Sequence, residues 1–219
     1  MRPIDIGRLV IVPLAALAIV ACSSVVPGVS SSTANDRVER FIAQLTRDVD
    51  VDYTPIVDAG DASRRADLIV LGTITTASEG LEISGREGVW NHMLNLDVRV
   101  ERVLSGMADL VGKDVHVEFF VSSVTGGNEL EAALPAVRAV FVLDDITRWI
   151  PFPDAIIKYP DGLVEGEAIF TPFVDGVVFD NPGGARHLYL SEEEAAKSWT
   201  QGGSFDDLIA TIQAAADSH

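Results

Sequence analysis

The side chains of this 219-residue chain best suited to acid–base or metal chemistry are its four histidines, His92, His116, His187 and His219. No two of them have the His-Glu-x-x-His spacing that puts two zinc ligands on one helix face. His116 is out of phase with the apolar residues around it, so we expect it to be exposed. His92 and His187 could meet only in the fold. We therefore predict no metal site from the histidines.

The acidic and hydroxyl side chains give no catalytic pattern either. Asp48, Asp50 and Asp52 alternate like the start of an EF-hand loop. The sixth and twelfth positions of that loop need Gly and Glu, and here they are Tyr53 and Ala59. The chain contains no Gly-x-Ser-x-Gly elbow, Ser-x-x-Lys motif or phosphate-binding glycine loop. We predict no catalytic residue and no cofactor.

One stretch has the composition of a binding surface. Trp149, Phe152 and Tyr159 lie in a segment that also contains Pro151, Pro153 and Pro160. Aromatic rings on a proline-stiffened loop lose little entropy on binding. These three residues are the candidate binding site. The alternative is that the rings cover one end of the fold, because large aromatic side chains are usually at least partly buried.

Cys22 is the single cysteine, and it ends the run Leu17-Ala18-Ile19-Val20-Ala21-Cys22. This run resembles the lipobox of bacterial lipoproteins. Arg2 and Arg8 precede an apolar stretch that is shorter than the ~20 residues needed to span a bilayer. The resemblance implies a signal peptide over residues 1–21, acylation of Cys22, and a lipid-anchored protein on the exported face of the cell membrane. An ordinary cleaved signal peptide is the alternative.

Composition restricts the partners. The chain has 33 acidic and 16 basic side chains and a formal net charge of −17. This balance argues against nucleic acid, which attracts basic surfaces, and against electrostatic attraction to anionic lipids. With Cys22 acylated, no thiol remains for a disulfide. The expected partners are the membrane, through the N-terminal lipid, and an envelope protein or glycan.

The order of elements predicts how these residues are positioned. Residues 22–35 read as a flexible tether, and residues 36–219 as a single β-rich domain. Helical spacing predicts a helix over 38–45, capped by Asn35 or Asp36. Period-two patterns predict strands at 94–101 and 115–121, and apolar runs predict strands at 68–75 and 139–143. Residues 165–171 and 176–179 complete a β-rich middle, with turns that include Asp175-Gly176. Ser191 with Glu194, and Ser204 with Asp207, predict two further helix starts.

Residues 66–121 resemble the opening half of netrin-like modules, the OB-type barrels of tissue inhibitors of metalloproteinases. The similarity lies in Ala66-Asp67 before an apolar strand, in the long strand at 94–100 with its turn at Ser105-Gly106, and in the third strand at 115–121. Those inhibitors act through an N-terminal cysteine amine and contain several disulfides. This domain contains no cysteine, so the resemblance implies the barrel and not the inhibition.

Together these patterns predict an α+β fold. We expect a mainly antiparallel β-barrel or strongly curved sheet with an N-terminal helix and C-terminal helices. The favoured function is a non-enzymatic binding or interaction module at the cell envelope. An envelope hydrolase whose residues meet only in the fold, and a structural or assembly lipoprotein, are the alternatives.

Overall fold

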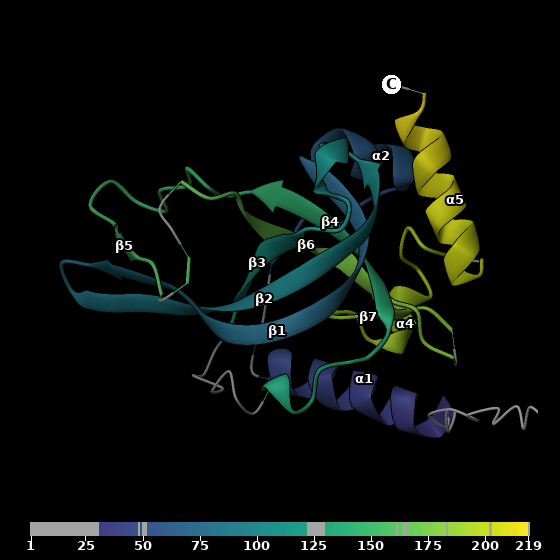
Figure 1. The fold of residues 1–219 in the computed structure, drawn as a ribbon, viewed down its shortest axis with the longest axis horizontal. Coiled ribbons are helices and arrows are strands. Elements are labelled where there is room, and N and C mark those ends of the chain that lie inside the picture. Colours follow the sequence, from purple (N-terminus) through teal and green to yellow (C-terminus); the bar gives the residue numbers. More distant parts are fainter. Residues whose placement is uncertain are drawn as a thin grey trace, which may run out of the picture.

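The computed structural model describes residues 31–47, 49, 52–121, 130–160, 162–163, 166–182, 184–201 and 203–218. The predicted signal peptide and Cys22 lie outside these ranges. Within them the chain forms four α-helices, one short 3-10 helix and one seven-stranded sheet, which confirms the α+β class (Figure 1). The elements are α1 (Ser31–Leu45), α2 (Ala59–Arg65), β1 (Leu68–Gly85), β2 (Gly88–Ser105), η1 (Ala108–Leu110), β3 (Asp114–Phe120), β4 (Arg138–Asp145), β5 (Ile156–Lys158), β6 (Ile169–Phe179), β7 (Arg186–His187), α4 (Glu192–Ala195) and α5 (Phe205–Ala216).

Five strands form a closed ring of hydrogen-bonded pairs, in the order β1–β2–β3–β6–β4 and back to β1. All of these pairs are antiparallel except β3 and β6, which run parallel and pair at His116↔Ile169 and Val117↔Phe170. The sheet is therefore mainly antiparallel, as the sequence predicts. The two short strands join from outside, β5 on the far half of β1 and β7 on β6.

The two longest strands, β1 and β2, extend well beyond the ring. Each has 18 residues, and they pair as a hairpin that protrudes at the left of Figure 1. Their register shifts between Glu79 and Glu82, and such irregularities bend a strand. A Cβ on Gly80 would lie 2.8 Å from the Met93 carbonyl carbon, so a residue without a side chain is needed where β1 crosses β2 this closely.

The main core fills the ring. Strand β2 contributes its alternate residues Leu94, Leu96, Val98 and Val100, all at most 2% exposed. Helix α1 packs on the same cluster through Val38, Phe41, Ile42 and Leu45. The Phe41 ring meets Phe179 of β6 edge to face, with 6.1 Å between centroids. The alternating pattern of β2 thus identifies its buried face correctly.

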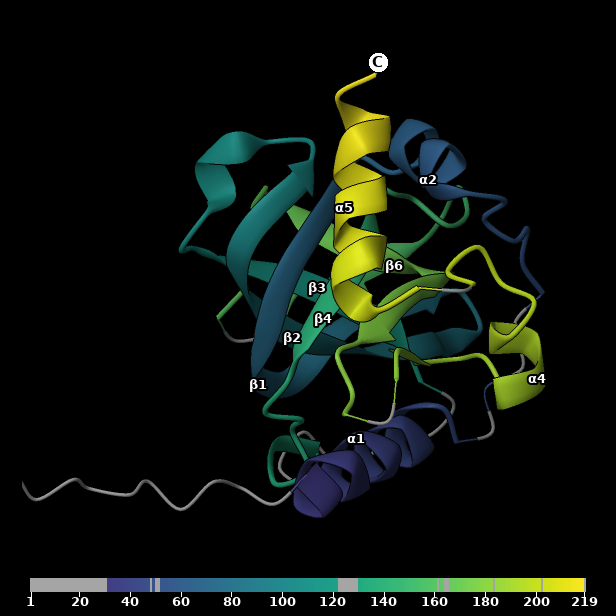
Figure 2. The ribbon, with the colours of Figure 1, turned by 90° about the vertical axis from the view of Figure 1, so that its right-hand side faces the viewer.

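A second core lies on the outer face of the ring, beneath α2 and α5 (Figure 2). Helix α5 buries one apolar face, Phe205, Leu208, Ile209 and Ile212, against residues of β1, β4 and β6. Both predicted helix starts are confirmed as capping boxes. Ser191 and Ser204 accept a hydrogen bond from the backbone N–H three residues on, and the acidic side chain there accepts one in return.

Two predicted boundaries are wrong. Helix α1 begins at Ser31, so Asn35 and Asp36 lie inside it; no Gly or Pro interrupts the chain between Ser31 and Asn35. The expected turn at Asp175-Gly176 lies within strand β6. A Cβ on Gly176 would lie 2.9 Å from Cβ of Val142, so this glycine allows β6 to pack closely on β4. The sequence pattern indicates a turn here instead.

Candidate functional site

The predicted binding residues lie on the protruding part of the molecule. We call residues 81–93 and 146–160 the aromatic arm; it comprises the far half of the β1–β2 hairpin, β5 and the segment between β4 and β5. Trp149, Phe152 and Tyr159 are all half-buried and pack on a small cluster of Leu81, Ile83, Met93, Leu163 and Ile169. The structure therefore brings the three predicted residues together, and they partly cover the small apolar cluster of the arm.

The aromatic rings of the arm are ordered by edge-to-face contacts. The Phe152 ring meets Trp90 with 5.8 Å between centroids, and the Trp149 ring meets Phe120 at 6.1 Å. Gly85 lies under Phe152, because a Cβ there would be 2.9 Å from the ring. The rings are thus held in fixed orientations on a strand scaffold, a property of preorganised binding surfaces.

The arm also exposes large apolar side chains that the sequence analysis did not select. Val89, Trp90, Ile150 and Ile156 are between 52% and 68% exposed. With Phe120 beside them, they make up five of the eight exposed large apolar side chains in the described residues. Clustering of this kind marks interaction surfaces in soluble proteins. A Val-Trp pair directly after Gly88, at the end of a long strand, is the sequence signal that could have identified them.

A cavity of about 170 Å³ opens at the base of the arm. Its wall includes His92, Lys158 and Pro160, with Glu82 between the two basic side chains. Glu82 lies 3.7 Å from Nδ1 of His92 and 3.9 Å from Nζ of Lys158. His92 and Pro160 therefore share a cavity, whereas His187 lines a different recess, so the two histidines do not meet.

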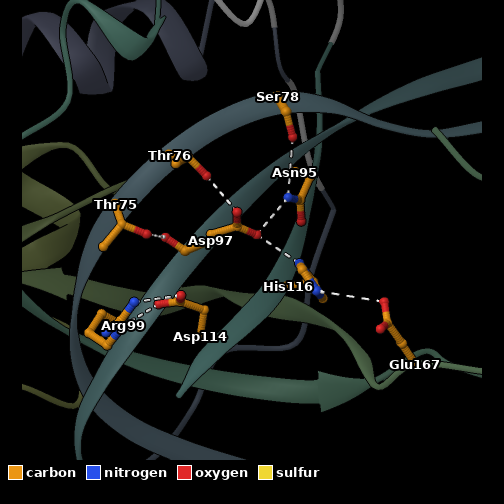
Figure 3. Close-up of polar contacts among 9 residues, drawn as sticks. All are labelled: Thr75, Thr76, Ser78, Asn95, Asp97, Arg99, Asp114, His116 and Glu167. Carbon is orange, nitrogen blue, oxygen red and sulfur yellow. Dashed lines mark hydrogen bonds and ion pairs between the residues drawn. The ribbon is translucent and has the colours of Figure 1, made fainter. Parts of the chain in front are cut away.

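A row of polar side chains covers the outer face of β2 and β3 (Figure 3). The registered pairs across the two strands are Asn95↔Glu118, Asp97↔His116 and Arg99↔Asp114. Nδ1 of His116 lies 2.7 Å from Asp97, and Arg99 holds Asp114 through two guanidinium nitrogens. The expectation that His116 is exposed is wrong, because this network leaves its side chain 26% exposed.

Asp97 is the centre of that network. Burial by itself would raise the pKa of its carboxyl, but hydrogen bonds from Thr76, Asn95 and His116 more than offset burial and hold the pKa below its usual value. Thr76 donates to Oδ2, and Nδ2 of Asn95 donates to Oδ1 over 3.0 Å (Figure 3). A carboxylate with its oxygens occupied in this way orients its neighbours and is poorly placed to accept a substrate proton.

Glu118 is the most deeply buried acidic group of the described residues. Its Oε2 accepts a hydrogen bond of 3.0 Å from the Leu81 N–H, while Oε1 is buried without a partner. Burial raises the pKa of Glu118 to about 7, because a charge there is poorly solvated. The bulge at Gly80 places the backbone of β1 directly over this carboxyl. Nothing in the local sequence indicates this burial.

The histidine nearest to hydroxyl groups is His187, on β7. Its Nε2 lies 2.6 Å from Oγ1 of Thr200 and 3.2 Å from Oγ of Ser198. Burial lowers the pKa of His187 to about 4, so the ring is neutral at pH 7. A base with this pKa is weak at neutral pH.

Three further findings bear on the function. In the described ranges no three His, Cys, Asp or Glu side chains are grouped to hold a metal ion. No described helix has the length and apolar character needed to cross a membrane. Comparisons of the chain with protein-family models, with curated proteins and with solved structures found no match.

Proposed function

We propose that this chain is an exported lipoprotein, anchored to the cell membrane by acyl chains on Cys22, and that it is a non-enzymatic binding module. The aromatic arm is its contact surface, and an envelope protein is its partner. We also infer that the five-stranded ring is a small β-barrel of the OB type. The clustering of exposed Val89, Trp90, Ile150 and Ile156 on the arm is the observation that carries the binding proposal.

Charge supports the choice of the arm. The whole chain carries a net charge of −17, whereas the arm carries as many basic as acidic side chains. The basic ones are Arg86, Arg148 and Lys158, and the acidic ones are Glu82, Glu87 and Asp154. An apolar, electrically balanced patch on an acidic protein is the part of the surface that a protein partner can approach with the least repulsion.

The position of the arm also fits this role. Helix α1 starts at the right of Figure 1, and the tip of the β1–β2 hairpin lies at the left, at the opposite end of the long axis. A chain tethered to the membrane through residues before Ser31 can therefore present the arm away from the lipid. A partner elsewhere in the envelope is then within reach of the arm.

Site-specific photocrosslinking in cells tests the arm. A photoreactive residue at Trp90 or Ile156 should yield a discrete crosslinked protein, because both side chains point into the proposed interface. The matched control is the exposed Ala214 on α5, which should yield none. Identical products from all three positions would refute the arm as the contact surface.

Mass spectrometry of the mature N-terminus tests the anchor. The expected species starts at Cys22 and carries acyl mass, and Cys22→Ala should leave the signal peptide attached. An unmodified N-terminus at another residue would refute the lipoprotein proposal and leave the arm proposal standing.

A further inference from the structure

The buried side chain of Glu118 lies where the aromatic arm leaves the ring. Strand β3 carries it on the outer face of the ring, and the backbone of β1 crosses it at Gly80 and Leu81. Leu81 is the first residue of the arm, and its N–H donates to Oε2 of Glu118 over 3.0 Å. A carboxyl group of the ring is therefore hydrogen-bonded directly to the backbone of the arm.

The crossing strand separates this carboxyl group from a cavity. A Cβ on Gly80 would collide with Oε2 of Glu118, so the glycine backbone rests against the carboxyl group. Gly80 also lines the cavity of about 170 Å³ at the base of the arm. The backbone at Gly80 thus contacts a side chain of 0% exposure and borders a space that water can enter.

The hydrogen bonding around Glu118 is short of a donor. Oε1 of Glu118 is buried without a partner, and so is Oδ1 of Asn95, the residue registered directly across from it on β2. A carboxylate and an amide oxygen only accept hydrogen bonds, and buried polar atoms are nearly always paired. A proton on Glu118 supplies a donor at this place, so the packing at the crossing suits the neutral acid.

The charges acting on Glu118 favour the neutral acid as well. Burial is the main cause that raises the pKa of Glu118 to about 7, and repulsion by the Asp97 carboxylate on β2 adds to it. The Leu81 N–H favours the ionised form, but this single hydrogen bond does not offset the other two effects. The net balance opposes ionisation while the crossing is closed.

The other elements at the crossing supply no cation that reaches Glu118. Glu79 and Glu82 of β1, His92 of β2 and Lys158 of β5 line the cavity on the far side of Gly80. From β6, the neutral Thr171 hydroxyl donates to the backbone carbonyl of Glu118 over 3.1 Å. Within the described residues, no basic side chain therefore stabilises an ionised Glu118.

We propose that Glu118 is a proton-operated latch between the ring and the aromatic arm. The protonated side chain stays beneath the crossing and keeps it closed. The ionised side chain is solvated only when Gly80 and Leu81 move away and admit water from the cavity, so the arm opens while the ring stays folded. The latch regulates the contact surface of the arm, and its bearing on binding rests on the proposed function.

Hydrogen–deuterium exchange of the full-length chain in detergent tests the latch. Between pH 6 and pH 8, opening that exposes Glu118 should become about tenfold more favourable, because the open state ionises with an ordinary carboxyl pKa and the closed state with a pKa of about 7. Protection factors, which exclude the intrinsic effect of pH on exchange, should fall by that factor for the amides of residues 81–84. Amides of the ring, such as Val98, should stay better protected than these at both pH values.

Two variants assign the response to one side chain. Glu118→Gln retains a carbonyl oxygen to accept from Leu81 and cannot ionise, so the protection of residues 81–84 should no longer depend on pH. His92→Gln is the matched control, because it removes a titratable side chain from the cavity wall and leaves Glu118 in place. This control should keep the tenfold change.

Three results would overturn the latch. Equal protection of residues 81–84 and of the ring would show that the arm opens only when the whole domain unfolds. Protection that does not change between pH 6 and pH 8 would show that Glu118 does not titrate at the crossing, and both of these results come from the native chain alone. A tenfold change that persists in Glu118→Gln would assign the response to another group.

These measurements involve no partner. An absence of crosslinking from Trp90 and Ile156 would refute the proposed contact surface and leave the latch standing, so the two failures are distinguishable.

Discussion

Both ends of strand β2 contain large apolar side chains, but these are buried at one end and exposed at the other. In the ring, Leu96, Val98 and Val100 are at most 1% exposed. At the far end, Val89 and Trp90 of the same strand are 52% and 59% exposed. The ring closes on itself, so its inner face is covered by strands from the opposite wall. The arm has a single layer of strands, and its cover comes from the segment between β4 and β5.

The apolar character of a strand segment therefore does not indicate whether its faces are covered. Coverage depends on what lies across from the strand, which is a property of the ring closure. Substitutions in β2 and its neighbours should accordingly lower the free energy of unfolding most in the ring and least at the tip of the arm.

The largest effect is expected inside the ring. Val98→Asp places a charge without a partner at a position with 0% exposure, and it should lower the free energy of unfolding by about 4 kcal/mol or more. Arg99→Ala, on the opposite face, is the control and should cost far less, since it removes an exposed ion pair with Asp114. Urea denaturation measures both. Equal losses would contradict the assigned faces.

The junction of ring and arm should show a pH effect. The pKa of Glu118 is about 7 in the fold, against 4.5 for an unperturbed carboxyl. The folded state thus retains a proton that the unfolded chain releases, and stability is lost as pH rises from about 4.5 to about 7. Glu118→Gln cannot titrate, so its stability relative to the native chain should grow by about 3 kcal/mol over that window.

Urea denaturation of both proteins at pH 4.5, 6 and 8 measures this difference. His187 titrates in the opposite sense, because burial lowers its pKa to about 4 and stability falls as the pH drops below about 6.5. That contribution is common to both proteins and cancels in the comparison. Parallel pH profiles for the native chain and Glu118→Gln would show that Glu118 is ionised in the fold.

A smaller effect is expected where the arm is covered. Trp149 is half-buried and packs on Phe120, so Trp149→Ala should cost about 2 kcal/mol, less than the 3–5 kcal/mol typical of a fully buried large ring. Thermal denaturation, with Arg148→Ala as the exposed neighbour control, measures it. A loss as large as that of Val98→Asp would mean that the arm is as tightly packed as the ring.

The smallest effect is expected at the tip of the arm. Trp90 is 59% exposed, so Trp90→Ala should change stability by no more than about 1 kcal/mol while abolishing crosslinking from Ile156. This variant separates binding from folding better than Trp149→Ala does. A loss of crosslinking accompanied by a large drop in melting temperature would assign Trp90 to packing.

Local features were predictable, and those that depend on ring closure were not. The capping boxes at Ser191 and Ser204 form within four residues, so the sequence alone identifies them. The burial of Glu118 depends on a bulge at Gly80 of another strand, and no local pattern signals it. The recess lined by Asn35, Asn181 and Thr200 likewise joins residues that are far apart along the chain.

The parallel pairing of β3 with β6 has a consequence for the order of assembly. We call this pairing the seam. It joins segments 53 residues apart through two registered residue pairs. The Thr171 hydroxyl also donates to the Glu118 carbonyl over 3.1 Å. The β1–β2 hairpin closes across a two-residue turn. Because loop-closure entropy favours near contacts, the hairpin should form before the seam. Amide protons at the seam should then exchange with solvent sooner than those of the hairpin within the ring.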